Sequence, residues 1–193
     1  MQLDKTYWNQ RYLDFKTGWD IGCISFPLQA YFDQLSNKDL RILIAGCGNA
    51  YEAEYLHKND FVNTYILDFS NTAINNFKKR VNTFPDDNIF ELDFFDLNQS
   101  FDIVIEQTFF CALDIKYRKA YAVKMYDLLS RNGKLVGLFF DDVFNNDAPP
   151  FGAPKELYLN LLAPYFNILT FEKCYNSIDS RLGNEFFCIA QKK

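Results

Sequence analysis

Short apolar runs alternate with longer amphipathic stretches along this chain of 193 residues, and the alternation restricts the folds open to it. The first run, residues 40–45, is almost continuously apolar, as in a parallel strand buried on both faces. A glycine turn follows it, then residues 50–58 with apolar side chains at helical spacing, and then a second strand at 63–67. Strands that alternate with helices in this order predict a doubly wound α/β fold, in which a mostly parallel sheet carries helices on both faces.

The alternation continues beyond these first elements. Ser70 or Asn71 caps a predicted helix that ends near Pro85. A longer helix over 113–129 is expected to stop at Asn132-Gly133, where glycine suits a left-handed cap. The other predicted elements are strands at 88–92, 101–105 and 134–140, and a helix at 154–162.

The C-terminal part of the chain follows a different pattern. Two strands, 166–175 and 185–190, are joined by a turn region and predict an antiparallel hairpin at the edge of the sheet. Residues 141–152, after the fifth strand, form a long polar loop, and loops of that length often carry function. The length of the chain fits one core, so we expect a single domain over 1–193.

The charge balance argues against two classes of partner. The chain has 25 acidic and 20 basic residues, a net charge of −5, and no cluster of lysine or arginine. Proteins that bind nucleic-acid phosphates or anionic membranes are normally basic, so neither partner is expected. No apolar run reaches the roughly 18 residues of a membrane span, and residues 1–14 lack the apolar core of a secretory signal. We expect a cytoplasmic protein.

Reactive side chains are few and do not suggest a metal site or a catalytic triad. Five cysteines at wide spacings, without a C-x-x-C, predict reduced thiols, and we interpret Cys47 and Cys111 as buried thiols rather than nucleophiles. His57 is the single histidine, and its helix favours a surface position, so no metal site is expected. Arg118 and Arg131 are interpreted as solvated charges.

Candidate binding residues follow the predicted strands, because ligands of open parallel sheets bind at the carboxyl ends of the strands. Gly46-Cys47-Gly48 comes directly after the first strand, and Asp68 ends the second, 22 positions after Gly46 (68 − 46). A carboxylate there can accept hydrogen bonds from ribose hydroxyls. Tyr51 occupies the position of the third glycine of a dinucleotide-binding turn, which argues against NAD. The alternative is that the glycines only make a turn and Asp68 only caps the next helix.

The third and fourth strands also end in candidate residues. Asp93 is placed to accept from an adenine amino group, with Phe94 packed against the ring. Glu106 is placed to face the positive part of a ligand. The alternatives are core packing for the phenylalanines and helix-end capping for Glu106.

An ordered set of motifs resembles the thiopurine S-methyltransferase family, especially its thiol and halide methyltransferase branch. The motifs are Trp8-Asn9-Gln10-Arg11-Tyr12, Gly18-Trp19-Asp20-Ile21-Gly22, Ile44-Ala45-Gly46-Cys47-Gly48, Thr108-Phe109-Phe110-Cys111-Ala112-Leu113, Gly133-Lys134-Leu135 and Pro149-Pro150-Phe151. This resemblance implies the Rossmann-like class I methyltransferase fold, a seven-stranded sheet with one antiparallel strand. It also implies S-adenosylmethionine as methyl donor and S-adenosylhomocysteine as product.

The resemblance also implies roles for individual residues. Gly46 and its neighbours contact the methionine part of the donor, Asp68 binds the ribose, and Asp93 with Phe94 binds the adenine. Trp8 and Trp19 match family tryptophans of an N-terminal lid that closes over the donor. The full set of donor-contact candidates is Trp8, Tyr12, Trp19, Gly46, Cys47, Gly48, Asp68, Phe69, Asp93, Phe94, Glu106 and Gln107.

The N-terminal lid is expected within residues 1–36, together with helices, and the α/β core over 40–193.

Several positions depart from the family pattern. Tyr12 stands where plant-like relatives have a further tryptophan, and Glu106-Gln107 replaces the usual Asp-Tyr. The segment 141–144 lacks a histidine often found before the Pro-Pro loop, and a C-terminal tryptophan is missing. These changes cluster on the acceptor side and leave the acceptor open.

The implied reaction is in-line transfer of a sulfonium methyl group to a soft nucleophile such as a thiol, hydrosulfide, thiocyanate, halide or thiopurine. Such acceptors need little or no base, so alignment of the reactants supplies most of the rate. An aromatic wall would attract the cationic donor and exclude water. Its candidates are Trp8, Tyr12, Trp19, Phe109 and Phe110, with core packing favoured for Phe110. Glu106 and Phe109 are the candidates closest to the chemistry.

Other functions stay open at this point. A class I methyltransferase acting on an oxygen or nitrogen centre would need a base near its acceptor, and the shortage of histidine disfavours it. A protein that binds S-adenosylmethionine without turnover, and an NAD-dependent oxidoreductase, are weaker alternatives. The expected partner is a small-molecule acceptor, and the expected oligomeric state is a monomer.

Overall fold

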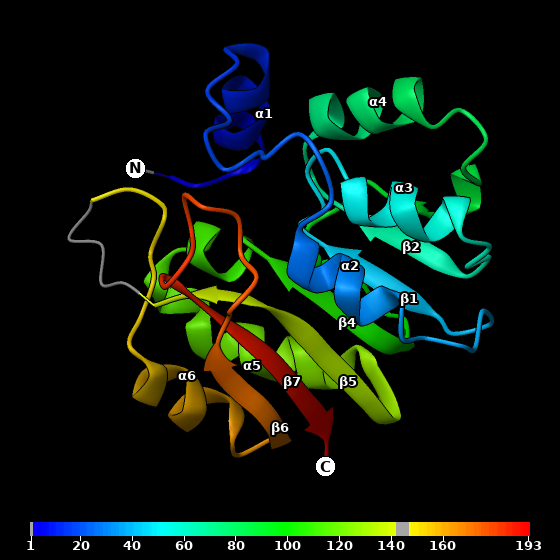
Figure 1. The fold of residues 1–193 in the computed structure, drawn as a ribbon. Coiled ribbons are helices and arrows are strands. Elements are labelled where there is room, and N and C mark those ends of the chain that lie inside the picture. Colours follow the sequence, from blue (N-terminus) through cyan, green and yellow to red (C-terminus); the bar gives the residue numbers. More distant parts are fainter. Residues whose placement is uncertain (1, 142–146) are drawn as a thin grey trace.

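The computed structural model describes residues 2–141 and 147–193, and a seven-stranded sheet runs through its centre (Figure 1). The strands are β1 (Ile42–Ala45), β2 (Thr64–Leu67), β3 (Ile89–Phe90), β4 (Phe101–Gln107), β5 (Leu129–Phe140), β6 (Phe166–Lys173) and β7 (Glu185–Lys192). The helices are α1 (Lys5–Leu13), α2 (Phe26–Phe32), α3 (Tyr51–Lys58), α4 (Asn71–Arg80), α5 (Arg118–Asp127) and α6 (Lys155–Leu162). Each strand expected from the sequence is present.

The sheet has the order β3-β2-β1-β4-β5-β7-β6. Strands β1 to β5 pair in parallel, whereas β7 is antiparallel to both of its neighbours, β5 and β6. This confirms the predicted mostly parallel sheet with a C-terminal antiparallel hairpin. Because the parallel strands run in one direction, their carboxyl ends meet at one edge, where Ala45 stands level with Leu67 and Glu106.

Helices cover both faces of the sheet, and β1 divides its side chains between two cores. Leu43 and Ala45 pack on the face covered by α5 and α6. Ile42 and Ile44 pack on the opposite face, which α2, α3 and α4 cover (Figure 1). All four side chains are at most 4% exposed, as expected of a strand buried on both faces. The doubly wound architecture is confirmed.

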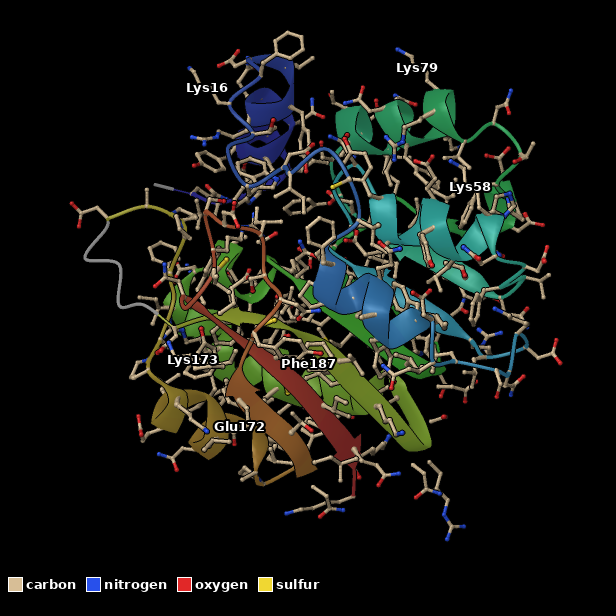
Figure 2. The ribbon with its side chains drawn as sticks, viewed as in Figure 1. Lys16, Lys58, Lys79, Glu172, Lys173 and Phe187 are labelled. Atoms are coloured by element: carbon tan, nitrogen blue, oxygen red, sulfur yellow. The ribbon has the colours of Figure 1, made fainter. Side chains whose placement is uncertain are left out.

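The outer strand β6 carries charged side chains near its end. Figure 2 shows Glu172 and Lys173 on this strand, and Glu172 Oε2 pairs with Lys155 Nζ of α6 at 3.0 Å. Charged side chains discourage an edge strand from pairing with a second sheet.

The connection between α5 and β5 differs from the sequence expectation. The helix expected over 113–129 begins only at Arg118, because the Asp114 side chain caps the backbone N–H of Lys116 and starts a separate 3-10 turn. It ends at Asp127, and β5 begins at Leu129 rather than at residue 134.

The residue with left-handed backbone in this connection is Asn132, with a φ of 61°, and not Gly133. Gly133 is instead required by space, since a Cβ there would lie 2.9 Å from the carbonyl oxygen of Ser130 and 3.1 Å from that of Phe101. Asparagine tolerates left-handed backbone better than most side chains. The expected left-handed helix cap at Gly133 is wrong, because α5 ends at Asp127 and residues 132–133 lie within β5.

Arg118 is not the solvated charge expected from the sequence. Its Nη2 donates to the carbonyl oxygens of Phe151 and Gly152, each at 3.0 Å, and its guanidinium carbon lies 5.3 Å from the centre of the Phe110 ring. Partial burial lowers its pKa. The arginine thus fastens the segment after Pro150 to the start of α5. Arg131 is exposed, as expected.

The long polar loop expected over 141–152 lies partly outside the described residues, which exclude 142–146. Among the residues of 2–141 and 147–193, no helix has the length and apolar character needed to cross a membrane.

Gly137 of β5 provides a test of the packing between β4 and β5. A Cβ at this position would lie 2.3 Å from the backbone oxygen of Glu106 and 2.5 Å from its Cβ. We expect Gly137→Ala to lower the free energy of unfolding by about 1–3 kcal/mol, because both strands would have to move apart. Urea denaturation measures this.

Gly18→Ala is the matched control, because a Cβ there would meet nothing within 4 Å. Its free energy of unfolding should stay within about 0.5 kcal/mol of the wild-type value. Equal losses in the two variants would contradict the close packing at Gly137.

Candidate functional site

A cavity of about 990 Å³ lies at the carboxyl edge of the sheet, and α1 borders it. In Figure 1 the parallel strands point toward the end of the molecule where α1 lies. The segments that line the cavity include residues of the N-terminal part up to Cys23, the turn after β1, the ends of β2 and β4, the residues after β3, Pro149 and Pro150, and the β6–β7 connection. The candidate residues expected at the strand ends therefore meet around one space.

The glycine turn after β1 is shaped by two aromatic rings. Gly46 has a φ of +59°, and a Cβ there would lie 2.2 Å from Cδ2 of Phe109. Gly48 has a φ of +52°, and a Cβ there would lie 2.6 Å from the hydroxyl oxygen of Tyr12. Left-handed backbone and close approach thus both require glycine at these positions. Cys47, between them, is buried, and burial raises the pKa of its thiol.

Asp68 connects this turn to the end of β2. Its Oδ2 accepts from the backbone N–H of Gly48 at 2.9 Å, and its Oδ1 accepts from that of Ser70 at 2.8 Å. Burial raises the pKa of the carboxyl group, and these backbone hydrogen bonds oppose the rise. Ser70 is itself the N-cap of α4, because its side chain accepts from the N–H of Ala73. Asp68 and the neighbouring Phe69 both line the cavity.

Trp8, Tyr12 and Trp19 form an aromatic cluster on the N-terminal side of the cavity. The ring centres of Trp8 and Trp19 are 5.4 Å apart and those of Tyr12 and Trp19 are 5.8 Å apart, both edge to face. Asn9 fastens α1 to the start of α4, since its Oδ1 accepts from the Ser70 hydroxyl at 3.1 Å and from the Thr72 N–H at 2.9 Å. All three rings line the cavity.

The residues after β3 and at the end of β4 complete the set that the structure brings together. Asp93 is exposed, and its Oδ1 accepts from the Phe95 N–H at 2.9 Å. Phe94 is buried, with its ring centre 5.0 Å from that of Phe109, and it still lines the cavity. Gln107 lines it too, and its Oε1 is buried without a hydrogen-bond partner.

Glu106 does not lie on this cavity, which corrects the expectation that it faces the positive part of a ligand. Its side chain is buried at 1% exposure. Oε1 accepts from the backbone N–H groups of Phe109 at 3.0 Å and Phe110 at 2.9 Å, and Oε2 accepts from the Tyr121 hydroxyl at 2.9 Å. The carboxyl group turns inward because these three donors offset part of the cost of its burial, and it caps the 3-10 turn after β4. Phe110 is in the core, as favoured.

Two buried charged residues that the sequence did not single out line the cavity. Glu52, in the first turn of α3, is 7% exposed, and burial raises the pKa of its carboxyl group to about 7. Arg181, between β6 and β7, is 8% exposed and donates through Nη2 to the carbonyl oxygen of Trp19 at 2.5 Å. Glu52 could have been identified from the sequence, because it lies at the start of the helix that follows the glycine turn. Nothing in the local sequence marks Arg181.

Cys47, Cys111 and His57 lie in environments that agree with the sequence expectations. Cys47 and Cys111 are buried, and burial raises the pKa of both thiols. All five cysteines are unpaired. His57 lies in the last turn of α3, with Nε2 3.0 Å from the Thr83 hydroxyl oxygen. Within residues 2–141 and 147–193, no three His, Cys, Asp or Glu side chains group as metal ligands would.

Comparisons with known sequences agree on one family. The sequence model of the thiopurine S-methyltransferase family matches residues 3–190. Thiocyanate methyltransferase 1 of Brassica oleracea is 29% identical over 186 residues, which cover 92% of this chain and 81% of that protein. A probable thiol methyltransferase 2 of Arabidopsis thaliana is 28% identical over 162 residues, which cover 81% of this chain and 71% of that protein.

Solved structures share the fold at lower identity. The 1,6-didemethyltoxoflavin-N1-methyltransferase of Burkholderia thailandensis, solved with S-adenosylhomocysteine, has a TM-score of 0.79 at 14% identity and covers 99% of this chain and 88% of its own. Magnesium protoporphyrin IX methyltransferase of Synechocystis has a TM-score of 0.75 at 15% identity and covers 98% of this chain and 99% of its own. These similarities show the class I methyltransferase fold.

Glu106 should make the protein less stable as the pH rises. Burial raises the pKa of its carboxyl group to about 7, above the value of about 4.3 in an unfolded chain, so the folded state holds this proton more tightly. The contribution is therefore fully present below about pH 4 and is lost as the pH rises through about 7. Glu106→Gln keeps an oxygen for the Phe109 and Phe110 amides. Its free energy of unfolding should fall less between about pH 5 and pH 8, by on the order of 1–3 kcal/mol.

Chemical denaturation at the two pH values measures this difference. Glu156→Gln, which changes an exposed glutamate of α6, is the control and should keep the wild-type dependence on pH. If Glu106→Gln also keeps the wild-type dependence on pH, the Glu106 carboxyl group does not titrate in this range.

Proposed function

Because the chain belongs to the thiopurine S-methyltransferase family, we propose that its cavity aligns a small soft nucleophile with the methyl group of S-adenosylmethionine. The protein is an S-adenosylmethionine-dependent methyltransferase, and the acceptors of this chemistry are thiols, hydrosulfide, thiocyanate, halides and thiopurines. The observation that carries the proposal is the extent of the family match. It spans residues 3–190 and so includes the glycine turn, the aromatic cluster and the β6–β7 connection.

The residues around the glycine turn suit the donor. The Asp68 oxygens accept from the backbone N–H groups of Gly48, Ser70 and Phe69 and keep further lone pairs, which we assign to the ribose hydroxyls. We assign the adenine to Asp93 and Phe94, and the methionine part to the turn Gly46–Gly48. Phe69 and Gln107 complete this set of donor contacts, and both line the cavity. The Gln107 Oε1 atom is buried without a hydrogen-bond partner, so it is free to accept a hydrogen bond from the bound donor.

The aromatic cluster has two roles in the proposed reaction. The donor supplies an electrophilic methyl group on a sulfonium cation when bound. The faces of Trp8, Tyr12, Trp19 and Phe109 attract that cation and exclude water, each by on the order of 0.5–2 kcal/mol. The N-terminal residues 1–36 would close over the core of residues 40–193 through the contacts of Asn9. Alignment rather than acid–base chemistry supplies most of the rate for an anionic acceptor.

Arg181 supports an acceptor with negative charge. It is buried, it lines the cavity, and its guanidinium is held by Trp19 and by Glu185, whose Oε1 lies 3.5 Å from Nη1. Glu185 also accepts from the Ser177 hydroxyl at 2.7 Å. A fixed guanidinium in the wall of the cavity favours thiocyanate, hydrosulfide, a thiolate or a halide over a neutral acceptor.

We further propose that the protein works as a cytoplasmic monomer on a small-molecule acceptor and without nucleic acid. The unpaired cysteines suit a reducing compartment. The charged edge of β6 and the net charge of −5 favour a monomer that does not bind polyanions.

Transfer from radiolabelled S-adenosylmethionine tests the function directly. Purified protein incubated with iodide, thiocyanate, hydrosulfide, an organic thiol or a thiopurine should yield labelled product with at least one of them. Phenolic and amine acceptors are the controls and should stay unlabelled. Labelling of an oxygen or nitrogen acceptor alone would overturn the proposed acceptor class, and no labelling despite donor binding would indicate a binding protein.

Asp68→Ala tests the ribose assignment by calorimetry with S-adenosylhomocysteine. Loss of two hydrogen bonds to a carboxylate, each worth about 1.5–3 kcal/mol, should weaken binding at least about 100-fold. Asp86→Ala, which removes an exposed carboxylate paired with Lys78, should bind as the wild type does. Undiminished affinity in a folded Asp68→Ala protein would exclude the assignment.

A further inference from the structure

Glu52 is a buried carboxyl group that the proposed mechanism has not used. It lies in the first turn of α3, four residues after Gly48, is 7% exposed and lines the cavity. No ion pair within 4.0 Å includes it in the part of the chain that the structure describes. Its neighbour Glu54, by contrast, pairs with Lys58 and Arg80. Burial of a carboxylate without a close cation is energetically costly, so we expect Glu52 to have a functional role.

The surroundings of Glu52 come from four parts of the chain. Backbone N–H groups of Ser25 and of Glu52 itself donate to the carboxylate. Asp20, from the segment that follows Trp19, opposes its ionisation, and Arg181 favours it. Glu52 in turn raises the pKa of the Cys47 thiol. Burial outweighs the favourable groups, so the carboxyl group titrates at about 7, the range in which a side chain exchanges protons efficiently at physiological pH.

The charge of Arg181, and not sheet order, indicates the side of the cavity on which the Glu52 carboxyl group lies, because α3 itself connects β1 to β2. The residues assigned to ribose and adenine follow β2 and β3, on one side of β1. Arg181 follows β6 and lies beyond β4 and β5, on the other side. Arg181 favours the ionised form of Glu52, and both side chains line the cavity. A donor that extends from β3 toward β1 therefore presents its methyl group toward Glu52 and Arg181.

We propose that Glu52 is the catalytic proton acceptor for acceptors that arrive with an S–H bond. This inference rests on the proposed methyl transfer and adds to it. The acceptor sulfur forms the new bond to the methyl carbon, while the bond between that carbon and the sulfonium sulfur breaks and leaves its electron pair on the departing thioether. The S–H proton passes to a carboxylate oxygen of Glu52 and later leaves to solvent. Arg181 holds the negative charge that develops on the acceptor sulfur.

These roles of Glu52 and Arg181 predict different behaviour for acceptors with an S–H proton and for acceptors without one. A thiol or hydrogen sulfide loses a proton during transfer and needs Glu52 in its ionised form. Iodide and thiocyanate carry no proton at neutral pH and need only alignment and the field of Arg181. Removing the carboxylate should therefore affect one group of acceptors and spare the other, which a purely structural role of Glu52 would not do.

The test compares Glu52→Gln with the wild type on 2-mercaptoethanol and on iodide. General-base catalysis contributes about 10²–10⁴-fold, so kcat/KM for the thiol should fall at least about 100-fold, and that for iodide should stay within about threefold. Glu54→Gln removes a carboxylate from the same helix on its solvent side and is the matched control. It should leave both activities unchanged.

The pH profile provides the second readout. In the wild type, thiol methylation should fall as the pH drops through about 7, while iodide methylation stays level across the same range. In Glu52→Gln the residual thiol activity should instead follow the ionisation of the thiol itself and rise up to about pH 9. Equal losses for thiol and iodide, or no loss for either, would overturn the role of Glu52. A wild-type protein that methylates neither acceptor would instead overturn the proposed function.

Discussion

The contact of two aromatic rings with the glycine turn after β1 is the constraint on which the rest of the site depends. Gly46 meets Phe109 from the end of β4, and Gly48 meets Tyr12 from α1. Both glycines have left-handed backbone, so no other residue could hold this turn without strain. The turn thereby joins the centre of the sheet to the N-terminal helix, and Asp68 secures it from β2 through the Gly48 amide.

Two buried carboxyl groups, those of Glu106 and Glu52, contribute to the site in different ways. Glu106 has three hydrogen-bond donors and holds the 3-10 turn that carries Phe109, so its charge serves the architecture. Glu52 has backbone donors only and faces the cavity near Arg181, so its charge remains available for chemistry. Burial raises the pKa of both carboxyl groups to about 7, so the difference between their roles comes from position, since Glu106 lies in the core and Glu52 lines the cavity.

The order of the strands determines which site residues lie on each side of the glycine turn. Strands β2 and β3 lie on one side of β1, and strands β4, β5, β7 and β6 lie on the other. In the proposed function, an extended donor bound across the carboxyl edge would have its nucleoside and its reactive sulfur on different sides of the glycine turn. Its reactive part would then lie toward Arg181, which α/β topology brings close to Trp19 although the two are 162 positions apart.

The sequence by itself determined the strand and helix order, the glycine turn and the acidic residue after β2, because periodicity and turn chemistry are local properties. It also indicated the family, since the motifs of that family lie in order along the chain. Only the tertiary structure decided which carboxylates face the cavity. Glu106 turns inward because the nearby Phe109 and Phe110 amides and the more distant Tyr121 hydroxyl donate to it, whereas Glu52 lines the cavity near Arg181 of the β6–β7 connection. Arg181 reaches the site through a connection whose sequence carries no signal, because its position follows from strand order alone.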